Sequence, residues 1–214
     1  MLGYEDKAKN GGIHMNKLLI KNADWVITLD DNGSRYANAD ILIEGNVIKK
    51  IGQNLTSDYD TKTIDARGKV VIPGMVNTHH HFYQTLTRSI PATQEIELFD
   101  WLTKLYEIWR ELDEEAVYFG TLVALGELLK TGCTTSTDHH YVFPKGKGSN
   151  LIDVQIKAAQ EIGIRFHPTR GSMSLSKKDG GLPPDDVVQT EEDILADSER
   201  LIKAYHDPNP YSMC

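Results

Sequence analysis

Short apolar stretches alternate with turns along the first third of the chain. Strands are expected at residues 17–20, 25–29, 39–44, 47–51 and 61–65. Gly45-Asn46 lies between two of them and is a dipeptide suited to a tight hairpin. The pattern predicts a small antiparallel β-module over residues 16–68 with a structural role. Residues 1–15 are polar and without periodicity, which predicts a disordered leader or a tag remnant.

From residue 69 onward the expected strands alternate with longer helical patterns. The strands are expected at residues 69–78, 134–138 and 164–169, and the helices at residues 97–110, 114–131, 150–161 and 191–205. Asp113 is the expected N-cap of the second helix, and Gly163 closes the third. Strands that alternate with helices are typical of βα units around a parallel sheet.

The first of these strands carries the chain's most distinctive chemistry. It is an apolar run, predicted to be buried, that ends in Asn77-Thr78 and three histidines. Side chains alternate along a strand, so His79 and His81 are expected to share a face while His80 points away. Two such imidazoles can converge on one metal ion, and imidazole suits zinc, iron or nickel. The alternative is a polar strand end or an adventitious metal-binding tract.

Polar residues also follow the other two strands of this region. The second strand ends in Asp138-His139-His140 and the third in Thr169-Arg170. An eight-stranded βα barrel displays its active site at the carboxyl ends of its strands and takes about 250 residues. Three βα units cannot close such a barrel. The expected fold class is therefore α/β, with residues 69–214 forming the N-terminal part of a (β/α)8 barrel in a longer protein.

Composition and charge exclude several classes of function. The 214 residues carry a net charge of −8, which argues against a nucleic-acid binder because such a protein needs a basic face. No apolar run approaches the roughly 20 residues that span a bilayer, and the start shows no secretory signal. Cys133 and Cys214 form no disulfide framework or CxxC motif, which suits the reducing cytoplasm.

A set of longer motifs runs along the chain. They are IPGMVNTHHH, THHHFYQTLTRSIP, LFDWLTKLYEIW, LLKTGCTTSTDHHYVFP and IGIRFHPTRGSM. Together they resemble the amidohydrolase superfamily, in its metal-dependent deaminase and aminohydrolase branch. Within that branch they look similar to 8-oxoguanine deaminases, with hydroxydechloroatrazine ethylaminohydrolase as a neighbouring group. The resemblance covers about residues 16–210.

The resemblance implies a metal-dependent hydrolase TIM barrel joined to a small β-sandwich that is built from both chain ends. It implies one divalent metal, zinc or alternatively iron, held by His79 and His81 together with a later His and a late Asp. In the family, a Glu near that later His moves protons as general acid and base. These three groups have no position in this sequence, so they are expected beyond Cys214.

The reaction implied by the resemblance is the hydrolytic deamination of an amino-substituted nitrogen heterocycle, with 8-oxoguanine as the expected substrate. The alternatives are an s-triazine of the hydroxyatrazine type, another purine, or a truncated product without catalysis. A small heterocycle is the expected partner, and neither a nucleic acid nor a membrane is. A homo-oligomer is left open.

Three residues are candidates for substrate contact. Gln84 offers an amide that both donates and accepts, and its alternative is a surface loop residue. Trp101 lies in a motif where related deaminases place an aromatic near the substrate, and its alternative is core packing. Arg170 ends the third strand and offers a guanidinium to a carbonyl or carboxylate, and its alternative is a structural ion pair.

Overall fold

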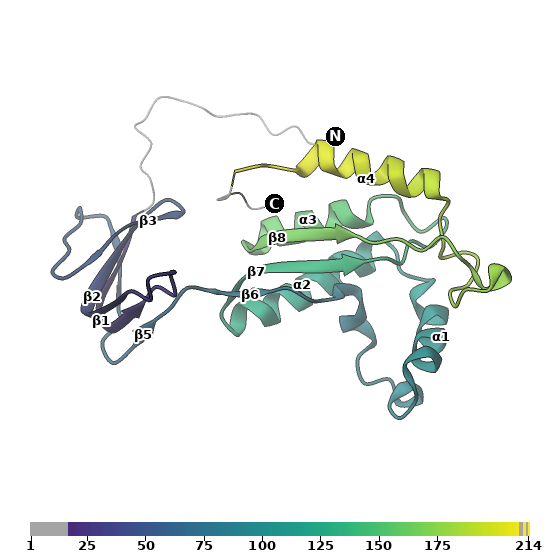
Figure 1. Cartoon of the computed structure of the whole chain (residues 1–214), viewed down its shortest axis with the longest axis horizontal. Coiled ribbons are helices and arrows are strands. Elements are labelled where there is room, and N and C mark those ends of the chain that lie inside the picture. The colour runs from purple at the N-terminus through teal and green to yellow at the C-terminus, as the bar shows by residue number, and fades with distance from the viewer. Residues whose placement is uncertain (1–16, 210–211, 213) are drawn as a thin grey trace. The chain divides into compact units, whose positions relative to one another are not determined.

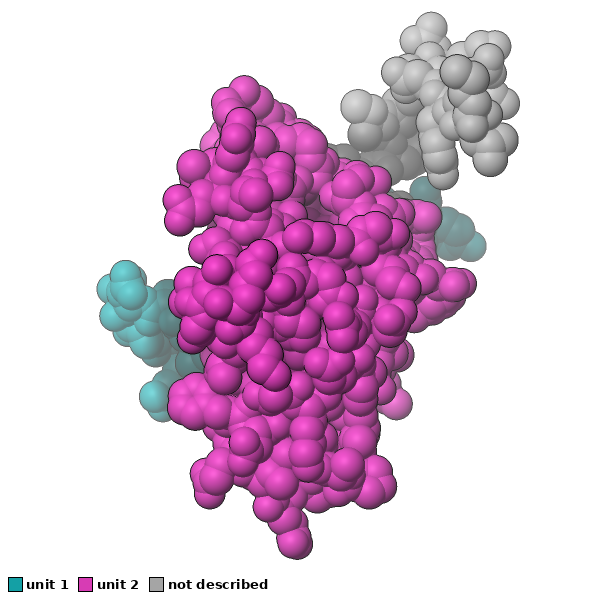
Figure 2. Space-filling view, turned by 90° about the vertical axis from the view of Figure 1, so that its right-hand side faces the viewer, with its two compact units in different colours: residues 1–73 teal, residues 74–214 magenta. Residues whose placement is uncertain are grey.

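The chain divides into two compact units, residues 1–73 and 74–214, which Figure 2 colours separately. The computed structural model describes residues 17–209, 212 and 214. The leader expected at residues 1–15 therefore lies outside the described residues. The boundary between the units falls after Pro73 in the chain, whereas the sequence pattern places it between residues 68 and 69.

The first unit is one mixed sheet of five strands. They are β1 (Lys17–Ile27), β2 (Arg35–Glu44), β3 (Val47–Gly52), β4 (Lys62–Asp65) and β5 (Val70–Val71). Their order is β3-β2-β1-β4, with β5 also paired to β1. Strand β1 is antiparallel to β2 but parallel to β4 and β5, so the prediction of an antiparallel module is wrong. The chain crosses over between β3 and β4 instead of folding back as a hairpin, which sets β4 parallel to β1.

The predicted hairpin between β2 and β3 is confirmed. The two strands pair antiparallel with Glu44 opposite Val47, and Gly45 has a φ of 62°. A two-residue turn needs this left-handed backbone, which glycine adopts without strain. A β-sandwich consists of two sheets, and residues 17–73 form a single sheet. The predicted sandwich therefore remains a prediction.

Strand β1 joins two stretches that the pattern predicts as separate strands. Its pairing with β2 shifts register between Ile20 and Ala23, where Asn22 has a φ of 61°. The buried carboxylate of Asp40 accepts the backbone N–H of Asn22 at 2.8 Å and that of Leu55 at 2.9 Å. The strand continues through the irregularity because a side chain satisfies this N–H.

The second unit contains three parallel strands, β6 (Met75–Asn77), β7 (Cys133–His140) and β8 (Arg165–Arg170), in that order. This confirms the predicted βα arrangement. The helices are α1 (Leu98–Trp109), α2 (Glu114–Lys130), α3 (Leu151–Ile162) and α4 (Glu191–Tyr205), with 3-10 turns η1 (Phe82–Thr87), η2 (Pro91–Thr93) and η3 (Lys177–Asp179). Figure 1 shows the strands side by side, with α2 and α3 behind them and α1 beyond their carboxyl ends.

The single strand predicted over residues 69–78 is wrong, because two sheets share it. Val70–Val71 pairs with β1 in the first unit, and Met75–Asn77 pairs with β7 in the second. Pro73 lies between them and has no N–H to give to a ladder. The side chains of Met75 and Val76 are 54% and 63% exposed, so the strand is not buried either. The reason is that β6 lies at the edge of the described sheet.

Local signals at the helix ends are confirmed. The Asp113 carboxylate caps α2 by accepting the N–H of Ala116 at 2.8 Å. Gly163 ends α3 in the left-handed conformation with a φ of 79°. The core of the unit is built from large side chains of η1, α1, α2, α3 and β8, among them Phe82, Tyr83, Trp109, Leu125, Leu151, Ile156 and Phe166.

Both cysteines are free thiols. Cys133 is buried in β7, and Cys214 is partly buried. Among the helices in the described part of the chain, none is both long and apolar enough to cross a bilayer.

Gly74 is required where the chain enters β6. A Cβ at this position would lie 2.1 Å from Oγ1 of Thr134 and 2.7 Å from its Cβ. We expect Gly74→Ala to lower the free energy of unfolding by about 1–3 kcal/mol, the usual cost of overpacking. Gly126→Ala in α2 is the matched control, because its Cβ would meet Ile162 at an ordinary 3.7 Å and alanine favours a helix. Denaturant unfolding of both variants checks this, and an undiminished stability of Gly74→Ala would contradict it.

Candidate metal centre

The histidine segment lies at the carboxyl end of the parallel sheet, directly after β6. The rings of His79 and His81 are neighbours, with centroids 5.2 Å apart and planes nearly perpendicular. His80 instead packs against the ring of Phe82, at 4.9 Å. The two candidate ligands therefore share a side, although β6 ends at Asn77 and they lie in the segment between the strand and η1.

The ring of His81 is held in one tautomer. Its Nδ1 lies 2.7 Å from the carbonyl oxygen of His139, and a carbonyl only accepts, so Nδ1 carries the hydrogen. In the neutral ring the lone pair is then on Nε2, which is the atom that such an imidazole offers to a metal. This donor chemistry fits a divalent ion such as zinc. Over the described residues no cluster of three or more His, Cys, Asp or Glu side chains forms a metal site, so the pair offers two candidate ligands.

Asp138 is a buried carboxylate beside the histidine segment, with 1% of its surface exposed. One oxygen accepts the backbone N–H of Phe82 at 2.7 Å, and the other accepts Nε2–H of Gln155 at 2.7 Å. Burial raises the pKa of Asp138 to about 7, against the lowering effect of these hydrogen bonds. The carboxyl group therefore titrates near neutral pH.

The two histidines after Asp138 lie in different surroundings. His140 is fully buried, its Nε2 lies 2.8 Å from the carbonyl oxygen of Val142, and burial lowers its pKa to about 3. His140 is therefore a neutral core residue. The ring of His139 is exposed and lies 5.5 Å from the ring of His81. Partial burial, followed by the nearby His81 and His79, lowers the pKa of His139.

A cavity of about 610 Å³ brings four of the predicted site residues together. His79, His81, Gln84 and Trp101 all line it. The backbone N–H of Gln84 donates to the carbonyl of His81 at 3.0 Å, which holds the amide-bearing residue next to the ligand pair. The ring of Trp101 packs edge-on against Trp109 at 5.5 Å, so the side chain serves both the cavity wall and the core.

Other cavity residues were not predicted from the sequence. They are Thr85, Thr87, Arg88, Ser89, Thr93 and Gln94, together with His80, which strand alternation predicts to point away from His79 and His81. Most lie in or beside η1 and η2, and such short 3-10 turns leave no hydrophobic periodicity in the sequence. Arg88 is the charged member, and its guanidinium pairs with Glu127 of α2 at 2.8 Å.

Arg170 does not lie among the residues that line this cavity. Its side chain is 6% exposed and donates to Asp197 at 3.1 Å, to the carbonyl of Gly171 at 2.7 Å and to Gln189. The guanidinium also lies over the ring of Phe143, 4.1 Å from its centroid. These contacts favour the structural ion pair over a substrate contact.

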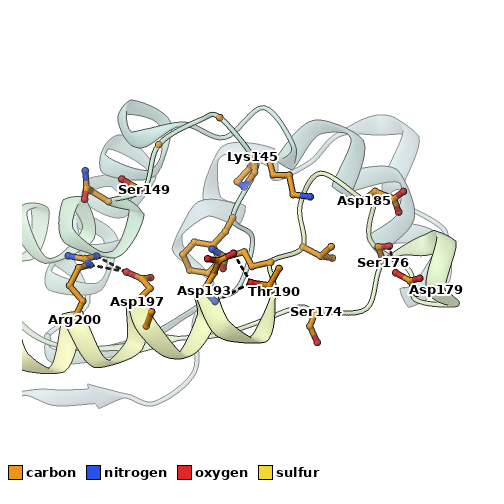
Figure 3. A pocket seen from close by; sticks show the side chains of 18 of the residues that line it. Lys145, Ser149, Ser174, Ser176, Asp179, Asp185, Thr190, Asp193, Asp197 and Arg200 are labelled. Atoms are coloured by element: carbon orange, nitrogen blue, oxygen red, sulfur yellow. Dashed lines mark hydrogen bonds and ion pairs between the residues drawn. The ribbon is translucent and has the colours of Figure 1, made fainter.

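A larger cavity, of about 730 Å³, lies between the loops after β7 and β8 and the start of α4 (Figure 3). Several of its charged side chains are already paired. Arg200 bonds Asp153 and Asp197, and Asp193 accepts from Thr190 at the start of α4. It has no histidine among its lining residues, so the smaller cavity is the better candidate for chemistry.

Comparison with known sequences gives one family and several relatives. The profile described as "Amidohydrolase family" matches residues 70–210. An 8-oxoguanine deaminase of Pseudomonas aeruginosa is 47% identical over 193 residues, which are 90% of this chain and 42% of the relative. Hydroxydechloroatrazine ethylaminohydrolase of Pseudomonas sp. (strain ADP) is 34% identical over 210 residues, 93% of this chain and 44% of the relative.

Solved structures agree with these sequences. A zinc-complexed atrazine chlorohydrolase from Arthrobacter aurescens TC1 superimposes with a TM-score of 0.83 at 35% identity. The match covers 92% of this chain and 45% of that one. The chain thus spans less than half the length of the relatives that it matches.

The raised pKa of Asp138 predicts that the stability of the fold depends on pH. The folded state keeps the carboxyl proton up to about pH 7, whereas the unfolded chain loses it near about pH 3.9. The stabilising contribution is therefore complete below about pH 4 and is lost as the pH rises through 7. Asp138→Asn removes the titrating group and with it this dependence. Between about pH 4 and 7 the free energy of unfolding of the wild type should therefore fall by on the order of 4 kcal/mol relative to that of the variant.

Denaturant unfolding between pH 4 and 8 measures the difference. Asp100→Asn, at an exposed carboxyl in α1, is the control that should follow the wild type. If the free energies of unfolding of the wild type and Asp138→Asn changed in parallel with pH, burial would not raise the pKa of Asp138.

Proposed function

The chain belongs to the amidohydrolase family, as its motifs predict, and on that premise we propose that the whole protein is a metal-dependent hydrolase of carbon–nitrogen bonds. Its reaction is the hydrolytic removal of an exocyclic amine from a nitrogen heterocycle, releasing ammonia. The proposed substrate is 8-oxoguanine, which is supported by 47% identity to an 8-oxoguanine deaminase.

The convergence of His79, His81, Gln84 and Trp101 on one cavity carries this proposal. The two imidazoles provide metal-binding nitrogens, the amide provides a donor and an acceptor, and the indole provides a flat apolar face. A planar heterocycle with polar edges matches this combination. The volume of about 610 Å³ is within the range of small-molecule sites.

The residues of this chain have distinct roles in the proposed reaction. The chemistry supplied by a divalent ion, when bound, is Lewis acidity and an activated water, whose pKa falls to about 7 at favourable zinc sites. His79 and His81 hold the ion, and the carbonyl of His139 keeps Nε2 of His81 available for it. Gln84 binds the edge of the heterocycle and Trp101 its face.

The remaining parts of the site are proposed to lie in the segment that the relatives have and this chain does not cover. They are the later His and late Asp ligands and the Glu that moves protons. Proton transfer by a positioned carboxylate contributes about 10²- to 10⁴-fold in rate. Residues 1–214 alone are therefore proposed to lack the activity of the whole protein.

A second candidate reaction is the aminohydrolysis of an s-triazine. It is favoured by the 34% identity to hydroxydechloroatrazine ethylaminohydrolase and by the structural similarity to an atrazine chlorohydrolase. Both reactions displace a substituent from a ring carbon beside ring nitrogens, so the same four side chains serve either. The higher identity to the 8-oxoguanine deaminase favours the purine.

Metal-ligand variants test the proposed activity. We expect the zinc-loaded whole protein to release ammonia from 8-oxoguanine, and His79→Ala and His81→Ala to reduce the rate by about 10²-fold or more, because each removes a protein ligand. His206→Ala, at an exposed histidine after α4, is the control that should keep full activity. Release of ethylamine from hydroxyatrazine is measured in parallel, as the readout of the competing reaction.

Two results would contradict the proposal. Undiminished activity in His79→Ala would remove this histidine from the metal site. Full activity of residues 1–214 alone would show that the additional segment of the relatives is not needed for chemistry.

Gln84→Leu tests the contact with the heterocycle. Leucine keeps the approximate size of the side chain but removes both the donor and the acceptor, so we expect KM to rise about tenfold, the equivalent of one or two neutral hydrogen bonds. Gln160→Leu, at an exposed amide in α3, is the matched control. Steady-state kinetics separates the effects, and an unchanged KM for Gln84→Leu would place the amide outside the substrate contact.

A further inference from the structure

We propose that Asp138 is the positioning residue of the metal site, holding the backbone that carries His79 and His81 in the geometry that binds the ion. This inference rests on the proposed function, because it concerns the same two histidines. Asp138 acts through the main chain, and its carboxylate bonds the backbone of Phe82 rather than an imidazole.

The histidine segment needs support from outside its own strand. The ladder between β6 and β7 ends at Asn77, which is two residues before the first ligand. Before that point, Nδ2–H of Asn77 donates to the Ser136 hydroxyl at 3.1 Å. Beyond it, the carbonyl of His80 accepts the N–H of His139 at 2.9 Å. Where regular strand pairing stops, the end of β7 therefore holds the histidine segment through individual hydrogen bonds.

The peptide unit between His81 and Phe82 is held at both of its polar groups. Its N–H donates to the Asp138 carboxylate at 2.7 Å, and its carbonyl accepts the N–H of Gln84 at 3.0 Å. A peptide unit is planar, so fixing both groups fixes the orientation of the whole plane. The backbone of His81 on one side of this plane is then held, and the ring follows from the backbone and from its own bond to His139.

Asp138 is itself fixed by rigid elements. It lies in β7 opposite Pro168 of β8, and Gln155 of α3 donates to its second oxygen at 2.7 Å. Both Asp138 and Gln155 are buried, with 1% and 0% of their surfaces exposed. A site supported by side chains that are locked in this way keeps the geometry that metal binding requires.

A purely structural role for Asp138 gives a different expectation. Removing a buried carboxylate that accepts two hydrogen bonds lowers stability in any protein, because the donors are left unpaired. Such damage does not by itself lower the affinity of a folded protein for metal. The metal affinity of folded variants is therefore the measurement that separates positioning from stability.

The experiment measures the zinc affinity of the metal-free whole protein by competition with a chromophoric chelator. We expect Asp138→Ala to bind zinc about 10- to 100-fold more weakly, the usual effect of losing a residue that supports a ligand. Asp138→Asn should retain most of the affinity, because its amide oxygen still accepts the N–H of Phe82. Thr121→Val is the matched control, since it removes a buried hydroxyl of α2 that bonds only within its own helix.

Each outcome decides the matter. Wild-type affinity in folded Asp138→Ala, or an equal loss in Thr121→Val, would overturn the positioning role. If Asp138→Ala does not fold, Asp138→Ser takes its place, because its hydroxyl oxygen lies one bond closer to the backbone than the Oδ1 that accepts the N–H of Phe82. His79→Ala separates this inference from the proposed function. Unchanged zinc affinity in His79→Ala would refute the metal site itself. If His79→Ala loses zinc affinity but Asp138→Ala keeps it, only the positioning role of Asp138 is refuted.

Discussion

The hydrogen bonds between the end of β7 and the segment after β6 are the constraint on which the site depends. Parallel strands bring their carboxyl ends to one edge of the sheet, but strand pairing stops at Asn77, before either histidine. Polar groups of Asp138 and His139 continue the contact, one through a side chain and the other through its backbone. In this way a regular fold positions an irregular segment.

The walls of the cavity follow from the same anchor. The N–H of Phe82 that Asp138 binds opens η1, and this 3-10 turn carries Gln84 into the cavity. At the end of η1, the hydroxyl of Thr87 accepts Nε1–H of Trp109 at 3.1 Å. The ring of Trp109 in turn supports Trp101 on the cavity wall. The candidate ligand pair, the amide of Gln84 and the indole of Trp101 are thus linked by one chain of contacts.

Much of this structure could be predicted from the sequence, because it depends on local signals. The Gly45-Asn46 hairpin, the Asp113 cap, the Gly163 helix end and the parallel order of the βα units each follow from residue type and periodicity. The family membership predicted from the motifs is confirmed by the profile match.

The remainder depends on contacts between distant residues. The division of residues 69–78 between two sheets is decided by the pairing of β5 with β1 and of β6 with β7. Arg170 forms an ion pair with Asp197, which is 27 residues away in the sequence. Strand alternation alone cannot tell which residue at the end of β7 supports the histidines, since that depends on where η1 begins. The roles of His79 and His81 as metal ligands remain predictions.

Anomalous diffraction at the zinc edge, from crystals of the zinc-loaded whole protein, tests the central claim most directly. The account predicts an anomalous peak bonded to ring nitrogens of His79 and His81 at about 2.0–2.1 Å, with Nε2 as the contributing atom of His81. The Nδ1 of His81 should remain on the carbonyl of His139. A peak centred on His80 or His139, or no peak near the His79–His81 pair, would contradict it.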